Sequence, residues 1–324
     1  MRWLRPLWFP VALGTTLCVL VLVDVLPGNR STAMVLHQQY REGEEWTAPN
    51  ESEIPFTEEG EQIRYGHELV ANTANYLGPK GIVAQLTNGM NCQNCHLYGG
   101  TQNFGIPFSA AAATFPQFLV RSGTIQSLES RVNDCMQRSL NGKPLDSLSH
   151  EMRAFIAYLK WIGKDVPKNT KPLGVSTGAN KLLFLERAAD PEKGKRVYVA
   201  NCQRCHGQNG EGTLAAEGTH YTYPPLWGDH SYNTAATLYR LTPLASFIKN
   251  NMPYGVNWKE PQLTDEEAWD VAAYISSQTR PVKIFPTDWK NLTKKPFDYP
   301  FSPYADSFTE QQHKYGPFGA LIKK

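Results

Sequence analysis

Apolar residues recur at helical spacing in several separate stretches of the chain. The spacing predicts helices over residues 59–77, 124–140 and 151–162, and a shorter one over residues 190–197. A final helix is expected after residue 264, with one apolar face made up of Ala268, Val271, Ala272 and Ile275. Loops with many Gly and Pro residues separate these stretches, so we predict a mainly α fold.

Polar residues at the expected helix ends support these boundaries. Ser149 is a candidate N-cap for the third helix, and Asp190 followed by Pro191 is typical of a helix start. Thr264 and Glu267 have the spacing of a capping box at the start of the last helix. Helix starts are therefore predicted in both halves of the chain.

The first 33 residues have the pattern of an export segment. Two arginines, Arg2 and Arg5, precede an apolar run over residues 7–23, and residues 31–33 offer small side chains for cleavage. The run is near the lower limit for spanning a bilayer. We expect a signal peptide or an uncleaved membrane anchor over residues 7–26. Either one places the mature protein in the periplasm.

One short motif occurs twice. Residues 91–96 read Asn-Cys-Gln-Asn-Cys-His and residues 201–206 read Asn-Cys-Gln-Arg-Cys-His. A Cys-x-x-Cys-His run is the attachment signal of a c-type haem, because the two thiols form thioethers to one porphyrin and the histidine lies under its iron. The repeat predicts two covalently bound haem c groups. They are held by Cys92 and Cys95 with His96 as ligand, and by Cys202 and Cys205 with His206.

The helices and motifs together predict two cytochrome c-type haem domains in tandem. Each half has a helix before its motif, a long loop after it and a helix at the end. We assign residues 34–165 to the first domain, 166–185 to a linker and 186–282 to the second domain. Residues 283–324 are rich in Pro and aromatic residues, and we expect this tail to wrap the body of the protein.

Composition narrows the function. The 324 residues carry a formal net charge of +2, so nothing indicates nucleic acid as a partner. Of the six cysteines, four belong to the haem motifs and Cys18 lies in the export segment, which leaves Cys135. A disulfide framework is excluded because Cys135 has no partner.

The sixth ligand of the second haem has a clear candidate. Met252 precedes Pro253, which favours an extended backbone suited to presenting a side chain from a loop. A thioether ligand suits one-electron transfer. The alternative is a methionine that fills a gap in the core, and Lys249, His220 and His230 are the other donors nearby.

For the first haem the candidate ligand is Cys135. Arg131 and Ser139 lie four residues on either side of it, so all three would share one helix face. Arg138 could join them. A nearby cation favours the thiolate, which is both a ligand and a nucleophile. On spacing alone, Cys135 as a small buried residue, with Met136 or a histidine as ligand, is an equal alternative.

Several further segments carry a family resemblance. They are Arg121-Ser122-Gly123, residues 131–135 and 138–142, 224–228, 231–233, 247–248, 251–253, 267–275, 277–278, 296–301 and 312–318. With these segments the chain resembles the thiosulfate dehydrogenases, di-haem cytochromes that join two thiosulfates into tetrathionate. The segment around Cys135 alone also resembles the haem subunit of the sulfur-oxidising multienzyme complex.

The resemblance implies a role for each matching residue. Cys135 would be the sulfur ligand of the first, catalytic haem, with Arg121, Arg131 and Ser139 in the thiosulfate pocket, and Met252 would be the ligand of the second haem. Some members exchange that methionine for an adjacent lysine on reduction. Here Asn251 occupies the adjacent position, so the exchange would need Lys249. A small soluble cytochrome c is the expected electron partner.

Three other functions fit parts of the pattern. A di-haem electron carrier without a substrate would not need a lone cysteine flanked by arginines. A di-haem peroxidase would need a displaceable histidine and a distal base, and no such cluster stands out. Structural zinc could use the Cys-x-x-Cys-His runs, and a haem stain that survives denaturation would exclude it.

Overall fold

The computed structural model describes residues 40–41, 43–175 and 182–322. The predicted export segment and possible anchor lie outside this part of the chain. Within it, no helix is long and apolar enough to cross a membrane. The fold is mainly helical, with two short antiparallel hairpins.

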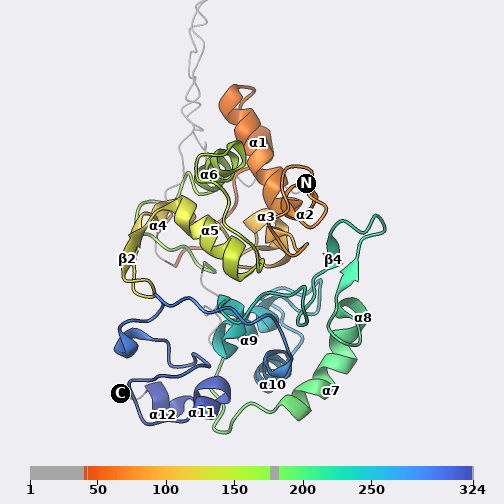
Figure 1. Ribbon diagram of the computed structural model, residues 1–324, viewed down its shortest axis with the longest axis vertical. Coiled ribbons are helices and arrows are strands. Elements are labelled where there is room, and N and C mark those ends of the chain that lie inside the picture. Colours follow the sequence, from red (N-terminus) through yellow and green to blue (C-terminus); the bar gives the residue numbers. More distant parts are fainter. Residues whose placement is uncertain (1–39, 42, 176–181, 323–324) are drawn as a thin grey trace, which may run out of the picture. The chain divides into compact units, whose positions relative to one another are not determined.

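The longer helices follow the predicted ones, and Figure 1 shows the arrangement of the elements. In the first half they are α1 (Glu58–Ala71), α2 (Thr73–Leu77), η2 (Cys92–Asn94), α3 (Leu97–Gly100), α4 (Ala111–Thr114), β1 (Gln117–Leu119), β2 (Thr124–Gln126), α5 (Leu128–Arg138) and α6 (His150–Ile162). In the second half they are α7 (Pro191–Asn201), α8 (Gln203–His206), β3 (Thr213–Leu214), β4 (Tyr221–Tyr223), α9 (Leu241–Asn251) and α10 (Asp265–Ser277). The tail adds α11 (Glu310–Tyr315) and α12 (Gly319–Ile322).

The predicted caps are confirmed. The Ser149 hydroxyl accepts a hydrogen bond from Met152 N–H at the start of α6. The Asp190 carboxylate accepts the N–H groups of Glu192 and Lys193 at the start of α7. Thr264 and Glu267 form a reciprocal capping box on α10. α7 continues to Asn201, four residues beyond the predicted end.

Two predicted helices differ in extent. Residues 124–126 are not helical but form β2, which pairs with β1, and α5 begins only at Leu128. Ser127 causes this boundary, because its backbone is extended and its hydroxyl accepts the Ser130 N–H as an N-cap. The predicted helix over 59–77 is broken at Asn72, whose φ of −126° and ψ of 38° are not helical.

Each half buries its own apolar cluster. α1 packs against α6 in the first half, whereas α10 packs against α7 and α9 in the second. The first cluster also takes in Tyr221, Tyr232 and Tyr239 from the second half. The residues around the two haem motifs are therefore held together by a shared apolar contact as well as by the chain.

Three segments without long helices also pack against the body. Trp46, in the segment before α1, is only 3% exposed. Leu182 and Phe184 contact the second core. In the tail, Lys283 donates to the carbonyls of Gln137 and Gly142, at the end of α5. The tail thus reaches the helix that carries Cys135.

Candidate functional site

The first Cys-x-x-Cys-His motif is fixed by the end of the first helix pair. The Thr73 hydroxyl accepts the Cys92 N–H at 2.9 Å, and the Asn91 side-chain oxygen accepts the Ala74 N–H at 2.8 Å. Both Thr73 and Asn91 are buried. These two bonds anchor the motif to α2, so the following histidine has a defined position.

The His96 ring is oriented for metal binding. Its Nδ1 lies 2.6 Å from the Ile106 carbonyl oxygen, and Phe108 stacks on the ring at 4.2 Å between centroids. A carbonyl only accepts, so Nδ1 carries the proton and Nε2 keeps its lone pair. Burial lowers the pKa of His96 to about 4, against the raising effect of the Ile106 bond. The imidazole is therefore neutral at ordinary pH, as a ligand must be.

A cavity of about 290 Å³ lies in front of this histidine, and α5 forms its other wall. Cys92, Cys95 and His96 line it from the motif, and Arg131, Cys135, Met136, Ser139 line it from α5 and its end. Apolar side chains, among them Phe115, Leu128 and Phe155, supply much of the remaining surface. The structure thus brings the predicted thiol, one guanidinium and the hydroxyl to the same cavity as the first haem motif.

Cys135 and Met136 both line this cavity, so its geometry allows either sulfur atom to be the ligand of the first haem. Met136 is 1% exposed and belongs to the first apolar cluster, whereas Cys135 is partly exposed. Ser139 lies at the C-cap of α5, where its N–H donates to the Cys135 carbonyl. The polar side of the helix end therefore carries Cys135 and Ser139.

Arg121 lies in a neighbouring cavity. That cavity, about 380 Å³, is lined by Arg121, Arg131 and Arg240 together with Asp288, Trp289, Tyr299 and several smaller residues. It shares Arg131 and Phe115 with the first cavity. Burial lowers the pKa of Arg121 to about 10, so its side chain stays cationic at neutral pH. Two of the three residues predicted for the substrate pocket thus face the haem cavity, and the third faces the arginine-lined cavity beside it.

Arg138 does not join Cys135. Its guanidinium is 7% exposed and is bound between Asp134 and Asp288, with Nε to Asp134 at 2.6 Å. The ion pair with Asp288 directs the side chain toward the tail. Arg138 therefore belongs to a buried ion-pair network behind the cavity.

That network was not predicted from the sequence. Asp134 accepts from Arg121, from Arg131 at 3.4 Å and from Arg138. The spacing of Asp134 to Arg131 and Arg138 along one helix is a local signal that could have indicated it. The pairing with Arg121 and Asp288 joins distant segments and leaves no such signal.

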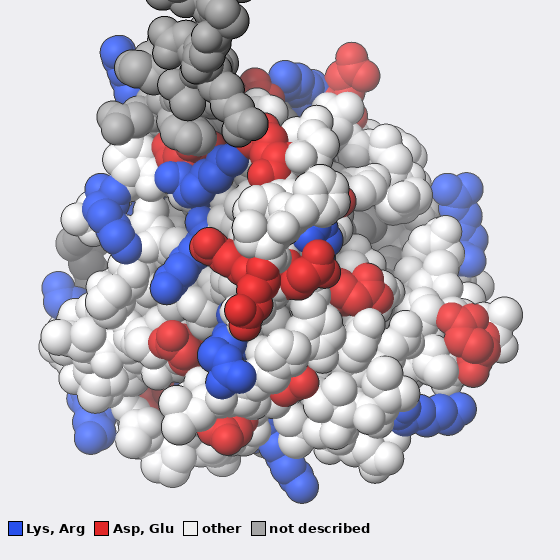
Figure 2. Space-filling view, turned by 90° about the horizontal axis from the view of Figure 1, so that it is seen from above, with Lys and Arg blue, Asp and Glu red and all other residues white. Residues whose placement is uncertain are grey.

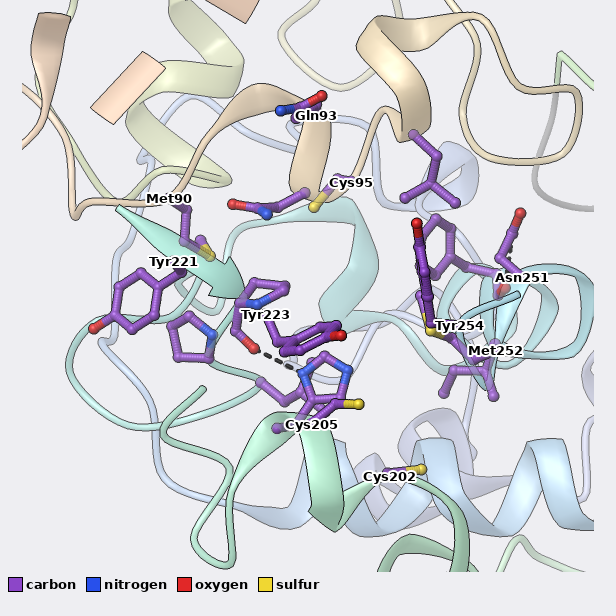
Figure 3. A pocket seen from close by; sticks show the side chains of 18 of the residues that line it. Met90, Gln93, Cys95, Cys202, Cys205, Tyr221, Tyr223, Asn251, Met252 and Tyr254 are labelled. Carbon is purple, nitrogen blue, oxygen red and sulfur yellow. Dashed lines mark hydrogen bonds between the residues drawn. The ribbon is translucent and has the colours of Figure 1, made fainter. Parts of the chain in front are cut away.

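The second motif repeats the histidine arrangement. His206 Nδ1 lies 2.8 Å from the Pro224 carbonyl oxygen, and burial lowers the pKa of this histidine. The motif opens into a cavity of about 410 Å³ whose lining includes Cys202, Cys205 and Met252. Figure 3 shows these sulfur-bearing side chains around the cavity, with Cys95 of the first motif at its edge. Met252 leaves α9 with an extended backbone, as predicted.

The competing donors differ in position. Lys249 Nζ donates to the Leu263 carbonyl at 2.6 Å and lies 2.9 Å from Asp265, and it does not line the cavity. His220 does line it, and its Nδ1 lies 3.2 Å from Glu217. Asn251 binds Gln102 and the Phe104 carbonyl of the first half. Of the donors weighed, Met252 and His220 have access.

The two haem cavities adjoin one another. Met90, Asn91 and Cys95 line both of them. In the described part of the chain no group of three or more His, Cys, Asp or Glu side chains is arranged to hold a metal ion.

On the face drawn in Figure 2, basic and acidic side chains are interspersed. A small anion is therefore not attracted by a large basic patch on that face. The arginines at the two cavities, together with Lys171 at the first, supply positive charge there.

Comparison with known proteins agrees with this geometry. Residues 83–167 match the family model "SoxA/TsdA, cytochrome c domain" and residues 191–279 match "Cytochrome c". Two cytochrome c domains and paired Cys-x-x-Cys-His cavities define a c-type cytochrome.

Relatives that match about three quarters of the chain identify the family within this class. The thiosulfate dehydrogenase of Psychrobacter arcticus is 36% identical over 75% of this chain and 71% of its own. That of Allochromatium vinosum is 37% identical over 74% of this chain and 86% of its own. The solved structure of thiosulfate dehydrogenase (TsdBA) from Marichromatium purpuratum has a TM-score of 0.64 and 29% identity. The alignment covers 73% of this chain and spans half of that longer one. The chain belongs to the thiosulfate dehydrogenase family and is an oxidoreductase.

Proposed function

We propose that this chain binds two covalent haem c groups and joins two thiosulfate ions into tetrathionate. One observation carries the proposal. Cys135, Arg131 and Ser139 line the same cavity as Cys92, Cys95 and His96. A thiol and an anion-binding guanidinium beside a haem motif suit a sulfur oxyanion substrate, and a plain electron carrier has no need of them.

The residues present fit the haem groups. In both motifs the histidine Nδ1 is engaged by a backbone carbonyl, so Nε2 is left to bind iron. Both cavities have walls rich in apolar side chains and hold the two cysteines needed for thioethers. His96 and Cys135 would bind the iron of the first haem, and His206 and Met252 would bind that of the second. Residues 34–165 and 186–282 would form the two haem domains.

Substrate binding would fall to three side chains. Thiosulfate is a dianion, and a guanidinium donates paired hydrogen bonds to such oxygens. Arg131 borders both cavities, so it can hold a substrate at the boundary between them. Ser139 offers a hydroxyl beside Cys135, and Arg121 offers a second cation in the adjoining cavity. These cations also offset the repulsion between two dianions.

The reaction balances with this arrangement. One bond forms between the terminal sulfurs of two thiosulfates, and no proton is consumed. Two electrons are released, and each haem, when bound, would accept one of them. Cys135 would act as the reactive sulfur. Its thiolate would form a sulfur–sulfur bond to one thiosulfate as the two electrons leave, and the second thiosulfate would break that bond, releasing tetrathionate and the thiolate. Because the two haem cavities share three wall residues, the electrons have a short path to the second domain.

The remaining parts of the proposal concern location and partner. The predicted export segment would place the enzyme in the periplasm, where haem c is attached. Residues 7–26 could alternatively keep it anchored to the inner membrane. A small soluble cytochrome c would collect the electrons.

The test uses the exported holoprotein. Its intact mass should exceed the polypeptide mass by two haems, and thiosulfate should reduce both haems as followed by absorbance. One tetrathionate should form for every two electrons delivered to an external acceptor. Haem reduction by general reductants but not by thiosulfate would instead identify an electron carrier.

A further inference from the structure

The carboxylate of Asp288 lies in the tail, yet it lines the arginine cavity next to Cys135. Its side chain is 8% exposed and forms two hydrogen bonds with Arg138, at 2.6 and 2.8 Å. For a cavity that takes a dianion, a carboxylate in the wall is electrostatically unfavourable. Its presence there therefore calls for another role.

The contacts of Arg138 indicate that role. On one side Arg138 holds Asp288, on the other its Nε donates to Asp134 at 2.6 Å. Phe285 of the tail lies beneath the guanidinium, 3.7 Å from ring centroid to carbon. A buried arginine with two carboxylates and an aromatic face has little freedom, so it fixes the position of Asp134.

Asp134 in turn binds the two arginines that would hold the substrate anion. Its Oδ2 accepts from Arg121 and from Arg131. The tail also binds Arg121 directly, because Trp289 N–H donates to the Arg121 carbonyl at 2.7 Å. Figure 1 shows the tail passing close to the end of the β1–β2 hairpin, where Arg121 lies. A continuous chain of ion pairs thus runs from the tail to both cavity arginines.

We propose that Asp288 is a positioning residue for thiosulfate binding: through Arg138 and Asp134 it holds Arg121 and Arg131 in place to receive the anion. This inference rests on the proposed function. The network contains three arginines and two aspartates, so one positive charge is left over for the substrate. Without Asp288, Arg138 would have Asp134 as its ion-pair partner in this network. Arg121 and Arg131 would then lose Asp134 as the partner that they share.

The sign of the effect separates positioning from simple electrostatics. Asp288→Asn removes a negative charge from the wall of an anion site. If only charge mattered, thiosulfate and tetrathionate would bind more tightly. Positioning predicts weaker binding, with KM for thiosulfate and Kd for tetrathionate raised on the order of tenfold. The electronic spectrum of the first haem should not change, because Cys135 and His96 keep their places.

The measurements use full-length holoprotein. Tetrathionate binding to the oxidised protein is followed by titration calorimetry, which needs no turnover, and KM and kcat for thiosulfate are measured separately. Haem content and the thermal unfolding midpoint report folding. The matched control is Asp270→Asn, because Asp270 is also buried and holds an arginine fork, Arg187, at 2.8 and 2.9 Å, in the second domain. This control should leave KM and Kd unchanged.

Two outcomes would overturn the inference. One is an unchanged or lowered KM in well-folded Asp288→Asn protein, and the other is an equal rise in the Asp270→Asn control. If Asp288→Asn does not accumulate, Asp288→Glu carries the test: it keeps the charge but displaces it, so KM should rise several-fold at normal haem content, and an unchanged KM refutes the role. Wild-type protein that forms no tetrathionate would instead refute the proposed function.

Discussion

The two haem cavities have the same proximal side and different distal sides. In both, a Cys-x-x-Cys-His segment presents a histidine whose Nδ1 is bound to a backbone carbonyl, Ile106 in one case and Pro224 in the other. Across the first cavity lies a helix with a thiol, a hydroxyl and a cation. Across the second lies a loop methionine among apolar and aromatic side chains.

Under the proposed function, this difference lets one repeated unit serve two purposes. The proximal side is set by the motif and its nearest loop, so duplication copies it. The distal side is set by whichever element packs across the cavity, α5 in the first half and the end of α9 in the second. Charged groups behind α5 suit chemistry on an anion, whereas a thioether suits electron transfer. The predictions below test whether the first cavity serves the reaction and the second serves electron transfer.

The largest effect is expected for Cys135→Ala. Both haems should stay covalently bound, because their thioethers come from other cysteines. Tetrathionate formation should fall by roughly 10³-fold or more, since the reacting sulfur is gone, and the thiolate-type signature of the first haem should disappear. Intact mass, absorbance and tetrathionate assays measure the three properties.

Met136→Leu is the matched control for Cys135. It removes the neighbouring cavity sulfur at nearly constant volume. The spectrum and rate should stay close to wild type. Near-normal turnover in Cys135→Ala protein would show that Cys135 is not the reactive sulfur of the first cavity. An altered first-haem spectrum in Met136→Leu protein would show that Cys135 is not its sulfur ligand.

Arg131→Ala should have the next largest effect. It removes a charge-assisted contact to the substrate while the reacting sulfur stays, so KM for thiosulfate should rise by roughly 10- to 100-fold with the first-haem spectrum preserved. Steady-state kinetics measure KM, and absorbance measures the spectrum of the first haem. Arg64→Ala, a similarly exposed arginine on α1 paired with Glu61, is the control and should leave KM unchanged. An unaltered KM in Arg131→Ala would remove this residue from the binding site.

Met252→Gly should change the second haem and spare the first. Loss of the thioether ligand should lower the midpoint potential of the second haem, because a soft sulfur ligand favours the reduced metal. A redox titration followed by absorbance resolves the two haems. Met90→Leu, a buried methionine that lines both cavities, is the control. If neither potential nor spectrum changes in Met252→Gly, this methionine is only a core residue.

The smallest effect is expected for Lys249→Ala. The Lys249 ammonium is held by the Leu263 carbonyl and Asp265, away from the cavity lining. We therefore expect no ligand exchange on reduction, and the reduced spectrum of the second haem should match that of wild type. A spectrum that changes only in the reduced variant would show that the lysine reaches the iron after all.

The sequence by itself determined the features whose signals are local. The two Cys-x-x-Cys-His runs indicate the haem attachment sites in five residues each, and three caps define helix starts because their partners lie within three residues. Cys135 with Arg131 and Ser139 also follows from helical spacing, and the structure places all three at one cavity. Local signals were not always recognised, because the Ser127 cap and the pairs of Asp134 with Arg131 and Arg138 also lie within about one turn and were not predicted.

The tertiary structure decided what depends on distant partners. Residues 124–126 look helical by their apolar spacing, but pairing with residues 117–119 makes them a strand. Arg138 seemed free to face Cys135, yet a carboxylate 150 residues further along the chain holds it on the other side. Arg121 likewise lies in the adjoining cavity because Asp134 and Trp289 bind it there. Ion pairs between remote segments leave no periodic mark in the sequence, and for that reason only the packed chain reveals them.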